Sequence, residues 1–181
     1  PFRASDGGRE AGRSAEGGMA EVLIAPLSWG LGHATRDLPI ARELMARGHR
    51  VTFAADGPAL ALLRRECPEC EAIPFPDYPP PFGASRFFMT RFALGVPAVL
   101  NGIRNERRRL AELLARRRFD LVISDNRLGL SHPEVPCFVI VHQLRFCMPA
   151  PVRWLEPASA AWNDGRMRRF TGVLVPDNPP G

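Results

Sequence analysis

A glycine-rich loop that contains a histidine follows the first apolar run of the chain. The run 21–26 is short and apolar, as expected of a buried parallel strand, and Gly30, Gly32 and His33 come soon after it. Glycines at a turn from a strand into a helix leave backbone amides and the positive helix end facing a cleft, which suits an anion. They can equally serve only to shape a tight turn. An imidazole at this junction can accept a proton near neutral pH, so His33 is the first candidate for a general base.

A second polar loop follows the run 119–124, the expected fourth strand, and contains Asp125, Asn126 and Arg127. Ligands of open parallel sheets bind beyond the carboxyl ends of the strands, which makes loops in this position site candidates. If the first and fourth strands are neighbours, Asp125 approaches His33, holds its tautomer and stabilises its protonated form. The same residues are also suited to an ordinary turn.

A third loop, after the expected fifth strand at 137–141, contains His142 and Gln143. His142 has the alternative role of a histidine satisfied at a strand end. The three loops together define the predicted site, whose catalytic residues are His33 and Asp125. Its expected substrate-binding residues share positions in or just after these loops: Trp29, Gly30, Leu31, Gly32, Thr35, Asn126, Arg127, His142 and Gln143.

The elements that position these loops follow an alternating strand and helix pattern. Thr35 is a plausible N-cap for an amphipathic helix that ends near Gly48, and 50–55 is a second apolar run. A short strand–helix–strand unit must cross over right-handedly into a parallel pair, so we expect an α/β domain with a Rossmann-like, doubly wound parallel sheet. The remaining expected elements are a helix at 58–66, a strand at 71–75, a helix at 86–118 interrupted near 95–97, and a strand at 172–175.

The length of 181 residues and the 45% hydrophobic content suit one domain with one substantial core. We assign residues 19–175 to this domain. Residues 1–18 are rich in Gly, Arg, Ser and Glu and are expected to form a disordered extension. Residues 176–181 are expected to begin a linker. No apolar stretch approaches the roughly 20 residues that span a bilayer.

The charge and the cysteines restrict the possible partners. The chain has 24 basic and 19 acidic residues, and every basic residue is arginine, a bias that raises the odds of an anionic partner only slightly; no nucleic-acid partner is expected. The arginine-rich run 104–118, with Glu106 and Glu112 interspersed, is typical of a solvated helix face. Four scattered cysteines are too few for a disulfide scaffold, which favours the cytoplasm. Cys67 and Cys70 have C-x-x-C spacing, which we interpret as incidental, and no metal site is expected.

Two other function classes remain open from the residues. Gly30 and Gly32 follow a strand, and Asp56 lies near the ribose-binding position of a dinucleotide fold, so an NAD or NADP oxidoreductase domain is the alternative. The dinucleotide fingerprint would have a third glycine where this chain has Thr35. A third interpretation is a binding module on an anionic membrane, based on the arginines and on the aromatic residues between Tyr78 and Phe92.

The run 25–36, containing Ser28-Trp29-Gly30-Leu31-Gly32-His33, and the run 47–53, containing Arg47-Gly48-His49, resemble the start of GT-B glycosyltransferases. The likeness is greatest to bacterial proteins grouped with the UDP-glycosyltransferases and with the peptidoglycan N-acetylglucosaminyltransferase. The run 120–126 is also similar to the fourth strand and loop of that group. The resemblance covers roughly residues 19–177.

The resemblance implies the N-terminal, acceptor-binding half of an enzyme that transfers a sugar from a nucleotide donor, usually a UDP-sugar, with inversion. A histidine matching His33 would deprotonate the acceptor hydroxyl, assisted by an aspartate matching Asp125. The acceptor would be a sugar or a lipid-linked molecule, and no cofactor or metal is implied, since the nucleotide sugar is a co-substrate. The protein would be cytoplasmic, with peripheral contact to the inner face of the membrane as an option. Because such enzymes bind the nucleotide through a C-terminal domain, we expect this chain to be a fragment that is inactive alone.

Overall fold

The computed structural model of the chain describes residues 18–78, 88–141 and 150–176; of residues 88–96 and 150–152 it describes only the backbone. The expected disordered extension and linker therefore fall outside the described residues, apart from residues 18 and 176. The aromatic side chains expected between residues 82 and 92 also fall outside. No helix in the described ranges is long and apolar enough to cross a membrane.

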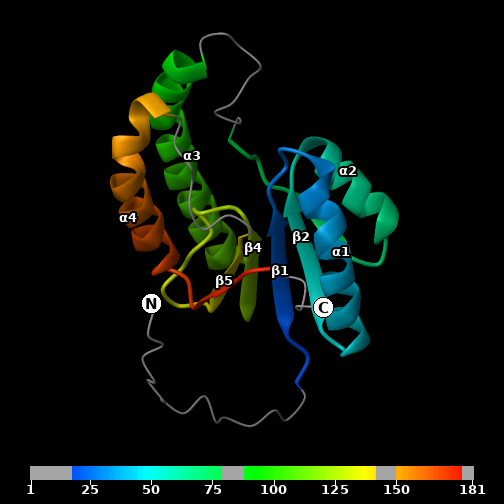
Figure 1. Cartoon of the computed structure of the whole chain (residues 1–181). Helices are drawn as coiled ribbons and strands as arrows, with labels where there is room; N and C mark the ends of the chain where they lie inside the picture. Colours follow the sequence, from blue (N-terminus) through cyan, green and yellow to red (C-terminus); the bar gives the residue numbers. More distant parts are fainter. Residues whose placement is uncertain (1–17, 79–87, 142–149, 177–181) are drawn as a thin grey trace, which may run out of the picture.

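Within the described residues, six strands form one sheet in which every neighbouring pair is parallel. The order is β3-β2-β1-β4-β5-β6 (Figure 1). The chain therefore moves outward from β1 in one direction and then returns to start again on its other side, which confirms the doubly wound α/β class. The strands are β1 (Glu21–Pro26), β2 (Arg50–Ala55), β3 (Glu71–Pro74), β4 (Leu121–Asp125), β5 (Cys137–Ile140) and β6 (Gly172–Leu174).

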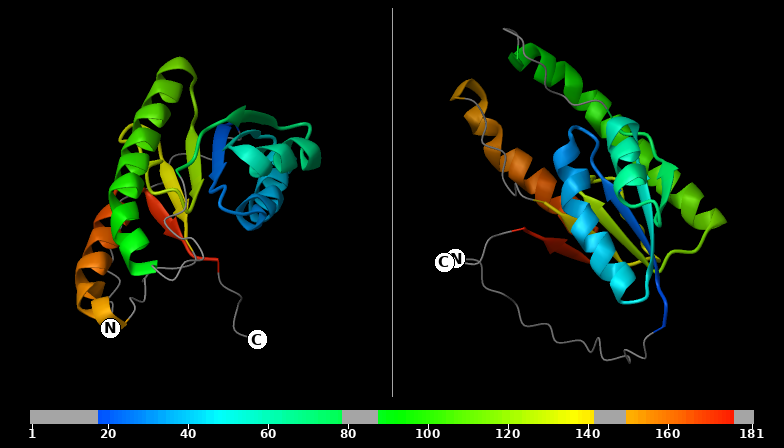
Figure 2. Two further views of the ribbon diagram at one scale, coloured as in Figure 1. Left: turned by 90° about the horizontal axis from the view of Figure 1, so that it is seen from above. Right: turned by 90° about the vertical axis from the view of Figure 1, so that its right-hand side faces the viewer.

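Helices cover both faces of this sheet. Helices α1 (Leu31–Ala46) and α2 (Gly57–Glu66) lie on one face, and α3 (Phe88–Arg116) and α4 (Glu156–Met167) lie on the other (Figures 1 and 2). A short 3-10 helix (Ala150–Leu155) precedes α4. This pattern of helices on both faces explains why the central strands are almost continuously apolar, since both sides of each strand are buried.

The alternation of side chains along β1 divides the core into two layers. Val22 and Ile24 pack with residues of α1 and α2, whereas Leu23 and Ala25 pack with Leu110 of α3 and its neighbours. All four β1 side chains are at most 1% exposed. The central strand is thus held rigidly from both sides, and the loop that follows it has a fixed starting point.

Three local features differ from the sequence predictions. Helix α1 begins at Leu31 and has Gly30 as its N-cap, so Thr35 lies inside the helix and is not a cap. Its hydroxyl instead donates a hydrogen bond to the carbonyl of Gly32 one turn earlier (3.0 Å). Helix α3 continues through Pro97 without the expected interruption. Helix α4 was not predicted at all.

The cysteine pair also differs from its prediction. Cys67 and Cys70, interpreted as incidental from their spacing, are joined by a disulfide in the structure. The bond connects the residue after α2 to the residue before β3, and both cysteines are buried. Cys137 is a buried free thiol.

Candidate active site

His33 and Asp125 meet at the carboxyl edge of the sheet. Asp125 is the last residue of β4, which pairs with β1 so that Asp125 lies opposite Pro26, and His33 is in the first turn of the helix that follows β1. Nδ1 of His33 lies 3.0 Å from Oδ2 of Asp125. The Asp125 side chain is fully buried and that of His33 is 16% exposed. The predicted approach of these two residues is confirmed, and it occurs at the point where the strand order reverses, where ligands of such sheets bind.

Arg36 is a third member of this cluster that the sequence did not reveal. It lies one helical turn after His33, so both side chains share a face of α1. Its guanidinium pairs with Asp125 through two nitrogens, Nε to Oδ2 at 3.2 Å and Nη2 to Oδ1. Nη2 also lies 3.0 Å from Nδ1 of His33. A fork of this kind fits a carboxylate closely and orients the Asp125 side chain.

Asp37, the next residue on α1, is buried with neither carboxylate oxygen hydrogen-bonded to any of the described residues. Burial raises the pKa of Asp37 to about 8, with a further contribution from the negative charge of Asp125 and an opposing one from Arg36. At neutral pH this side chain therefore carries a proton. It is a neutral neighbour of the His33, Arg36 and Asp125 cluster.

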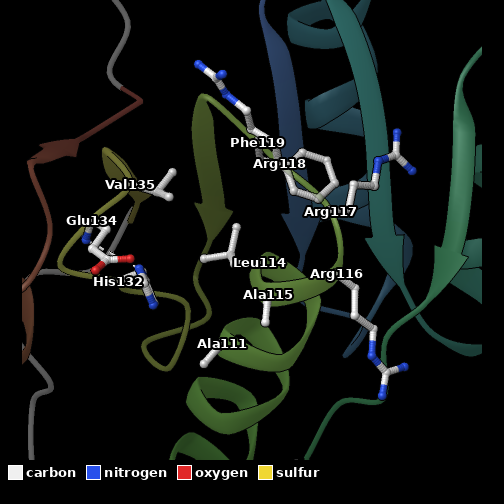
Figure 3. Close-up of a pocket in the computed structure, with 10 residues that line it drawn as sticks. All are labelled: Ala111, Leu114, Ala115, Arg116, Arg117, Arg118, Phe119, His132, Glu134 and Val135. Atoms are coloured by element: carbon white, nitrogen blue, oxygen red, sulfur yellow. Dashed lines mark hydrogen bonds between the residues drawn. The ribbon is translucent and has the colours of Figure 1, made fainter.

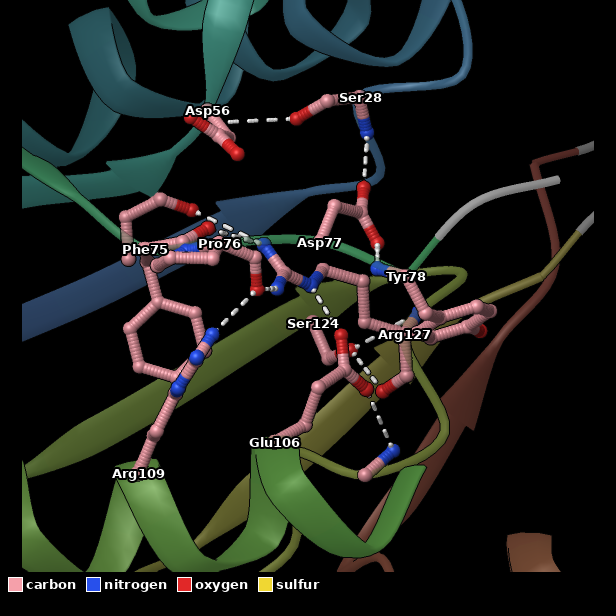
Figure 4. Close-up of polar contacts among 12 residues, drawn as sticks. Ser28, Asp56, Phe75, Pro76, Asp77, Tyr78, Glu106, Arg109, Ser124 and Arg127 are labelled. Atoms are coloured by element: carbon pink, nitrogen blue, oxygen red, sulfur yellow. Dashed lines mark hydrogen bonds and ion pairs between the residues drawn. The ribbon is translucent and has the colours of Figure 1, made fainter. Parts of the chain in front are cut away.

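The loop between β1 and α1 is held by the segment that follows β3. The backbone N–H of Ser28 donates to Oδ2 of Asp77 (2.7 Å), as Figure 4 shows, and the indole N–H of Trp29 donates to the carbonyl of Tyr78 (2.8 Å). The Trp29 and Tyr78 rings also meet edge to face, with centroids 5.4 Å apart. Burial of the phenol raises the pKa of Tyr78. Trp29 therefore anchors the loop, and its predicted contact with substrate stays a prediction.

Arg127 lies in the interior and has a structural environment. Its Nε donates to Oε1 of Glu106 (2.7 Å), and Nη2 donates to the carbonyl of Pro76 (3.0 Å), as Figure 4 shows. The guanidinium also stacks over the Phe75 ring at 4.9 Å. Both charged side chains are almost fully buried, at 0% and 2% exposure. Contact with a substrate, the prediction for Arg127, does not fit this burial, and Glu106 is likewise not on the solvated face expected for it.

The other predicted binding residues lie near the cluster in different environments. Apart from their chain neighbours and the helix's own backbone, no atom of the described residues lies within 4 Å of the Cβ position of Gly30 or Gly32, and Leu31 is 47% exposed. The backbone at the helix start is therefore open to a ligand. Asn126 has a φ of 60°, a left-handed conformation that asparagine tolerates, and its N–H donates to the carbonyl of Ile140 (2.9 Å). His142 and Gln143 lie outside the described residues.

Asp56, on which the dinucleotide alternative depends, has a local structural task. Its Oδ1 accepts a hydrogen bond from the N–H of Gly57 (2.8 Å), and Asp56 is the N-cap of α2. The backbone N–H of Asp56 donates to Oγ of Ser28 (3.3 Å). These contacts explain the aspartate at the end of β2 without a ribose.

A separate hollow of about 470 Å³ lies at the opposite end of the sheet (Figure 3). Its lining comes from the end of α3 and from the residues before β4 and β5, among them Phe119, His132 and Val135. These are the amino ends of the strands, where open parallel sheets do not bind their ligands. No cluster of three or more histidine, cysteine or acidic side chains suited to a metal ion occurs in residues 18–78, 88–141 and 150–176.

Solved structures of other proteins share this fold, although comparisons by sequence find no match. No protein-family model matches the sequence, and no curated protein matches it. Among solved structures, the chain is similar to the glycotransferase of kitacinnamycin, with 20% identity over 84% of this chain and 39% of that protein and a TM-score of 0.53. It is also similar to LpCGTa in complex with UDP, with 17% identity over 89% and 46% of the two chains and a TM-score of 0.56.

A third similar structure is that of Arabidopsis thaliana UGT89C1 complexed with UDP-L-rhamnose, with 12% identity over 88% of this chain and 45% of that protein and a TM-score of 0.56. The chain has the α/β fold found in one part of GT-B glycosyltransferases, as its sequence indicated. It spans less than half the length of each of these three proteins.

Proposed function

We propose that this chain is the N-terminal, acceptor-binding part of a glycosyltransferase in which His33 is the general base and Asp125 its partner. The observation that carries this proposal is the 3.0 Å approach of His33 Nδ1 to Asp125 Oδ2 at the reversal point of the sheet. A buried carboxylate that accepts a hydrogen bond from Nδ1–H favours the tautomer with its lone pair on Nε2, which is the form of imidazole that can act as a base.

In the proposed reaction, Nε2 of His33 removes the proton of an acceptor hydroxyl as its oxygen attacks the anomeric carbon of the donor sugar. The new carbon–oxygen bond forms while the bond to the nucleotide diphosphate breaks, and the nucleotide leaves as its diphosphate. Attack on the side opposite the leaving group inverts the anomeric centre. The imidazolium formed is stabilised by Asp125 and then loses its proton to solvent.

The proposed donor is a nucleotide sugar, with UDP as its first candidate. Two similar structures contain UDP or UDP-L-rhamnose. Since this chain covers less than half of those proteins, we assign donor binding to a second domain of a longer protein. The residues described here then contribute the acceptor side of the cleft, where the open backbone at Gly30 and Gly32 gives the acceptor close access to the helix end.

Release of UDP tests this proposal. The 181-residue chain and the longer protein that contains it are incubated with UDP-glucose or UDP-L-rhamnose and with quercetin or a panel of other hydroxyl acceptors. The longer protein should release UDP in an acceptor-dependent manner, whereas the 181-residue chain should not. Acceptor-dependent release of UDP by the 181-residue chain alone would contradict the assignment of donor binding to a second domain. Saturable binding of NAD by the chain would favour the oxidoreductase alternative.

A peripheral contact with an anionic membrane is a second candidate property, favoured by cationic and aromatic side chains of α3, the 3-10 helix and α4. Partial burial lowers the pKa of Arg166, near the end of α4, and repulsion from nearby arginines lowers it further. These arginines are Arg169, which follows α4, and Arg104 and Arg107 of α3. Two tryptophans, Trp154 and Trp162, are 76% and 37% exposed on the 3-10 helix and α4. Cationic and aromatic side chains together suit an anionic headgroup layer.

Vesicle sedimentation tests this membrane contact. We expect the protein to bind vesicles of phosphatidylglycerol and phosphatidylcholine but not phosphatidylcholine alone, and binding should weaken in Arg166→Glu. Equal binding to both kinds of vesicle, or none to either, would contradict an electrostatic membrane contact. The proposed localisation is accordingly the cytoplasm, at the inner face of the membrane.

A further inference from the structure

Nδ1 of His33 has two neighbours, one of which requires this nitrogen to be protonated and the other to be unprotonated. Asp125 Oδ2, at 3.0 Å, can only accept a hydrogen bond, so it requires a proton on Nδ1. Arg36 Nη2, also at 3.0 Å, can only donate one, so it requires a lone pair on Nδ1. A single nitrogen of a neutral imidazole cannot satisfy both. The two contacts therefore correspond to the two tautomers of His33.

The geometry of the guanidinium allows this competition. Nη2 carries two hydrogens, and one of them is directed to Oδ1 of Asp125, which leaves the second for Nδ1 of His33. Arg36 can therefore keep its pair with Asp125 while it contacts the imidazole. It also neutralises the carboxylate that would otherwise attract the Nδ1 proton without competition.

We propose that Arg36 is a positioning residue that competes with Asp125 for Nδ1 of His33 and so determines which ring nitrogen carries the proton. With Nδ1–H donating to Asp125, the lone pair is on Nε2 and His33 can act as a base. With Arg36 donating to Nδ1, the proton is on Nε2, which then has no lone pair free to accept a proton, so His33 cannot act as a base through that nitrogen. The importance of this competition for catalysis rests on the function proposed above, but the competition itself does not.

The tautomer is measurable in the chain without any turnover. Long-range ¹H–¹⁵N NMR distinguishes a protonated ring nitrogen from an unprotonated one, and the chain has only 4 histidines, so His33 can be assigned by substitution. The spectra are recorded about two pH units above an unperturbed imidazole, near pH 8.5, where a free ring is neutral. The expected result for the unsubstituted chain is that both tautomers of His33 are populated.

Two substitutions should change the ratio of the Nδ1–H and Nε2–H tautomers of His33 in opposite directions. Arg36→Ala removes the donor and should shift His33 toward Nδ1–H by about tenfold, the effect expected for loss of a charge-assisted hydrogen bond. Asp125→Asn removes the carboxylate and should shift it toward Nε2–H. A merely structural role for Arg36 would loosen the cluster and move both variants in the same direction, which would overturn the proposal.

Matched controls separate this effect from a general change in α1. Arg42→Ala lies on the same helix and removes an exposed arginine whose Nη2 donates to the carbonyl of Glu66, so the His33 ratio should stay unchanged. If Arg36→Ala does not fold, as judged by its amide spectrum, Arg36→Gln fills the space and provides the same comparison. An unsubstituted chain that is entirely Nδ1–H, with no response to loss of Arg36, would also contradict the proposal. Failure of UDP release would leave this NMR result standing, so the two proposals fail independently.

Discussion

Asp125 Oδ2 lies 3.0 Å from Nδ1 of His33, although 92 positions of sequence separate the two residues. They meet because β1 and β4 are hydrogen-bonded neighbours and because each residue stands at or just after the carboxyl end of its strand. In a doubly wound sheet this is where two chain segments diverge to opposite faces and leave room for a ligand. The approach of His33 to Asp125, on which the proposed chemistry depends, follows from this strand order.

Loss of the His33 side chain should therefore stop the chemistry without unfolding the domain. In the longer protein, His33→Ala should lower the turnover rate by about 10²- to 10⁴-fold, the usual range for lost general-base catalysis. Acceptor-dependent UDP release is the measurement. His132→Ala is a suitable control, because His132 lines the hollow at the opposite end of the sheet and should leave the rate unchanged. Equal rates for the two variants would exclude His33 as the base.

The buried carboxyl of Asp37 should make the stability of the chain pH-dependent. Its pKa of about 8 in the folded protein lies above the reference of 3.8, so the folded state keeps a proton that the unfolded chain releases. Stability contributed by this group is therefore fully present below pH 3.8, decreases as pH rises toward 8, and changes no further above that. Asp37→Asn should remove this dependence and, near pH 8, stabilise the chain by on the order of 5 kcal/mol.

Urea denaturation of the two proteins between pH 4 and pH 9 measures this difference. Asp164→Asn is the matched control, since Asp164 lies exposed on α4, and its effect should be small at every pH. An Asp37→Asn variant that differs from the unsubstituted chain by the same amount at pH 4 and pH 8 would show that Asp37 is ionised in the folded state.

The stability of the chain should depend on keeping both members of the buried ion pair between Arg127 and Glu106, because loss of one leaves the other charge buried and unpaired. Arg127→Met leaves the Glu106 carboxylate in the interior with only the N–H of Gly129 (3.2 Å), and burial already raises the pKa of Glu106 to about 7 despite the arginine. We expect a loss of about 3–5 kcal/mol in the free energy of unfolding. Replacing both residues together, with Met and Leu, should cost less than Arg127→Met alone.

Thermal and urea unfolding of these variants measure the coupling energy between Arg127 and Glu106. Arg108→Met is the control variant, on the same helix as Glu106. Arg108 lies 3.6 Å from Glu112 in an exposed ion pair, and exposed ion pairs contribute little to stability. If Arg127→Met were as well tolerated as Arg108→Met, the interior position of Arg127 would not be important for the fold.

The strands and the central pair of the site could be predicted from the sequence, whereas the residues around that pair could not. Buried parallel strands appear as short apolar runs, so β1 and β2 were found at their observed bounds. Once β1 and β4 are assumed to be neighbours, His33 and Asp125 must approach each other. Arg36 carries no such signal, because an arginine three residues after a histidine can turn to solvent unless a carboxylate from another strand is placed beside it.

Burial of charge was the main source of error. Glu106 lies in an arginine-rich helix and reads as one solvated residue among many, and only Arg127, 21 positions later, shows that its face of α3 is buried. The start of α1 was placed too late because Thr35 has a good capping side chain, while two glycines and a leucine before it have no helix signal. In the structure Gly30 is the N-cap, and Leu31 and Gly32 begin the first turn of α1.

Two glycines close to the loop should respond oppositely to alanine, because one is packed and the other is open. A Cβ added to Gly102 of α3 would lie 2.5 Å from Cβ of Tyr78, so Gly102→Ala must displace the tyrosine whose carbonyl holds Trp29. We expect a loss of about 1–3 kcal/mol. Gly32 lies in a helix, and no tertiary contact from residues 18–78, 88–141 or 150–176 comes within 4 Å of its Cβ position, so Gly32→Ala should stabilise the chain by about 0.5–1 kcal/mol.

The same pair of variants tests whether the acceptor approaches the backbone of the loop. In the longer protein, Gly32→Ala should raise the KM for the acceptor although the fold is more stable, because the new methyl group occupies space that the ligand would use. Gly102→Ala should lower the melting temperature and the turnover rate together, since it displaces the anchor of the whole loop. A Gly32→Ala variant that is stabilised and has an unchanged acceptor KM would place the acceptor away from the helix end and confine its contacts to the side chains of the cleft.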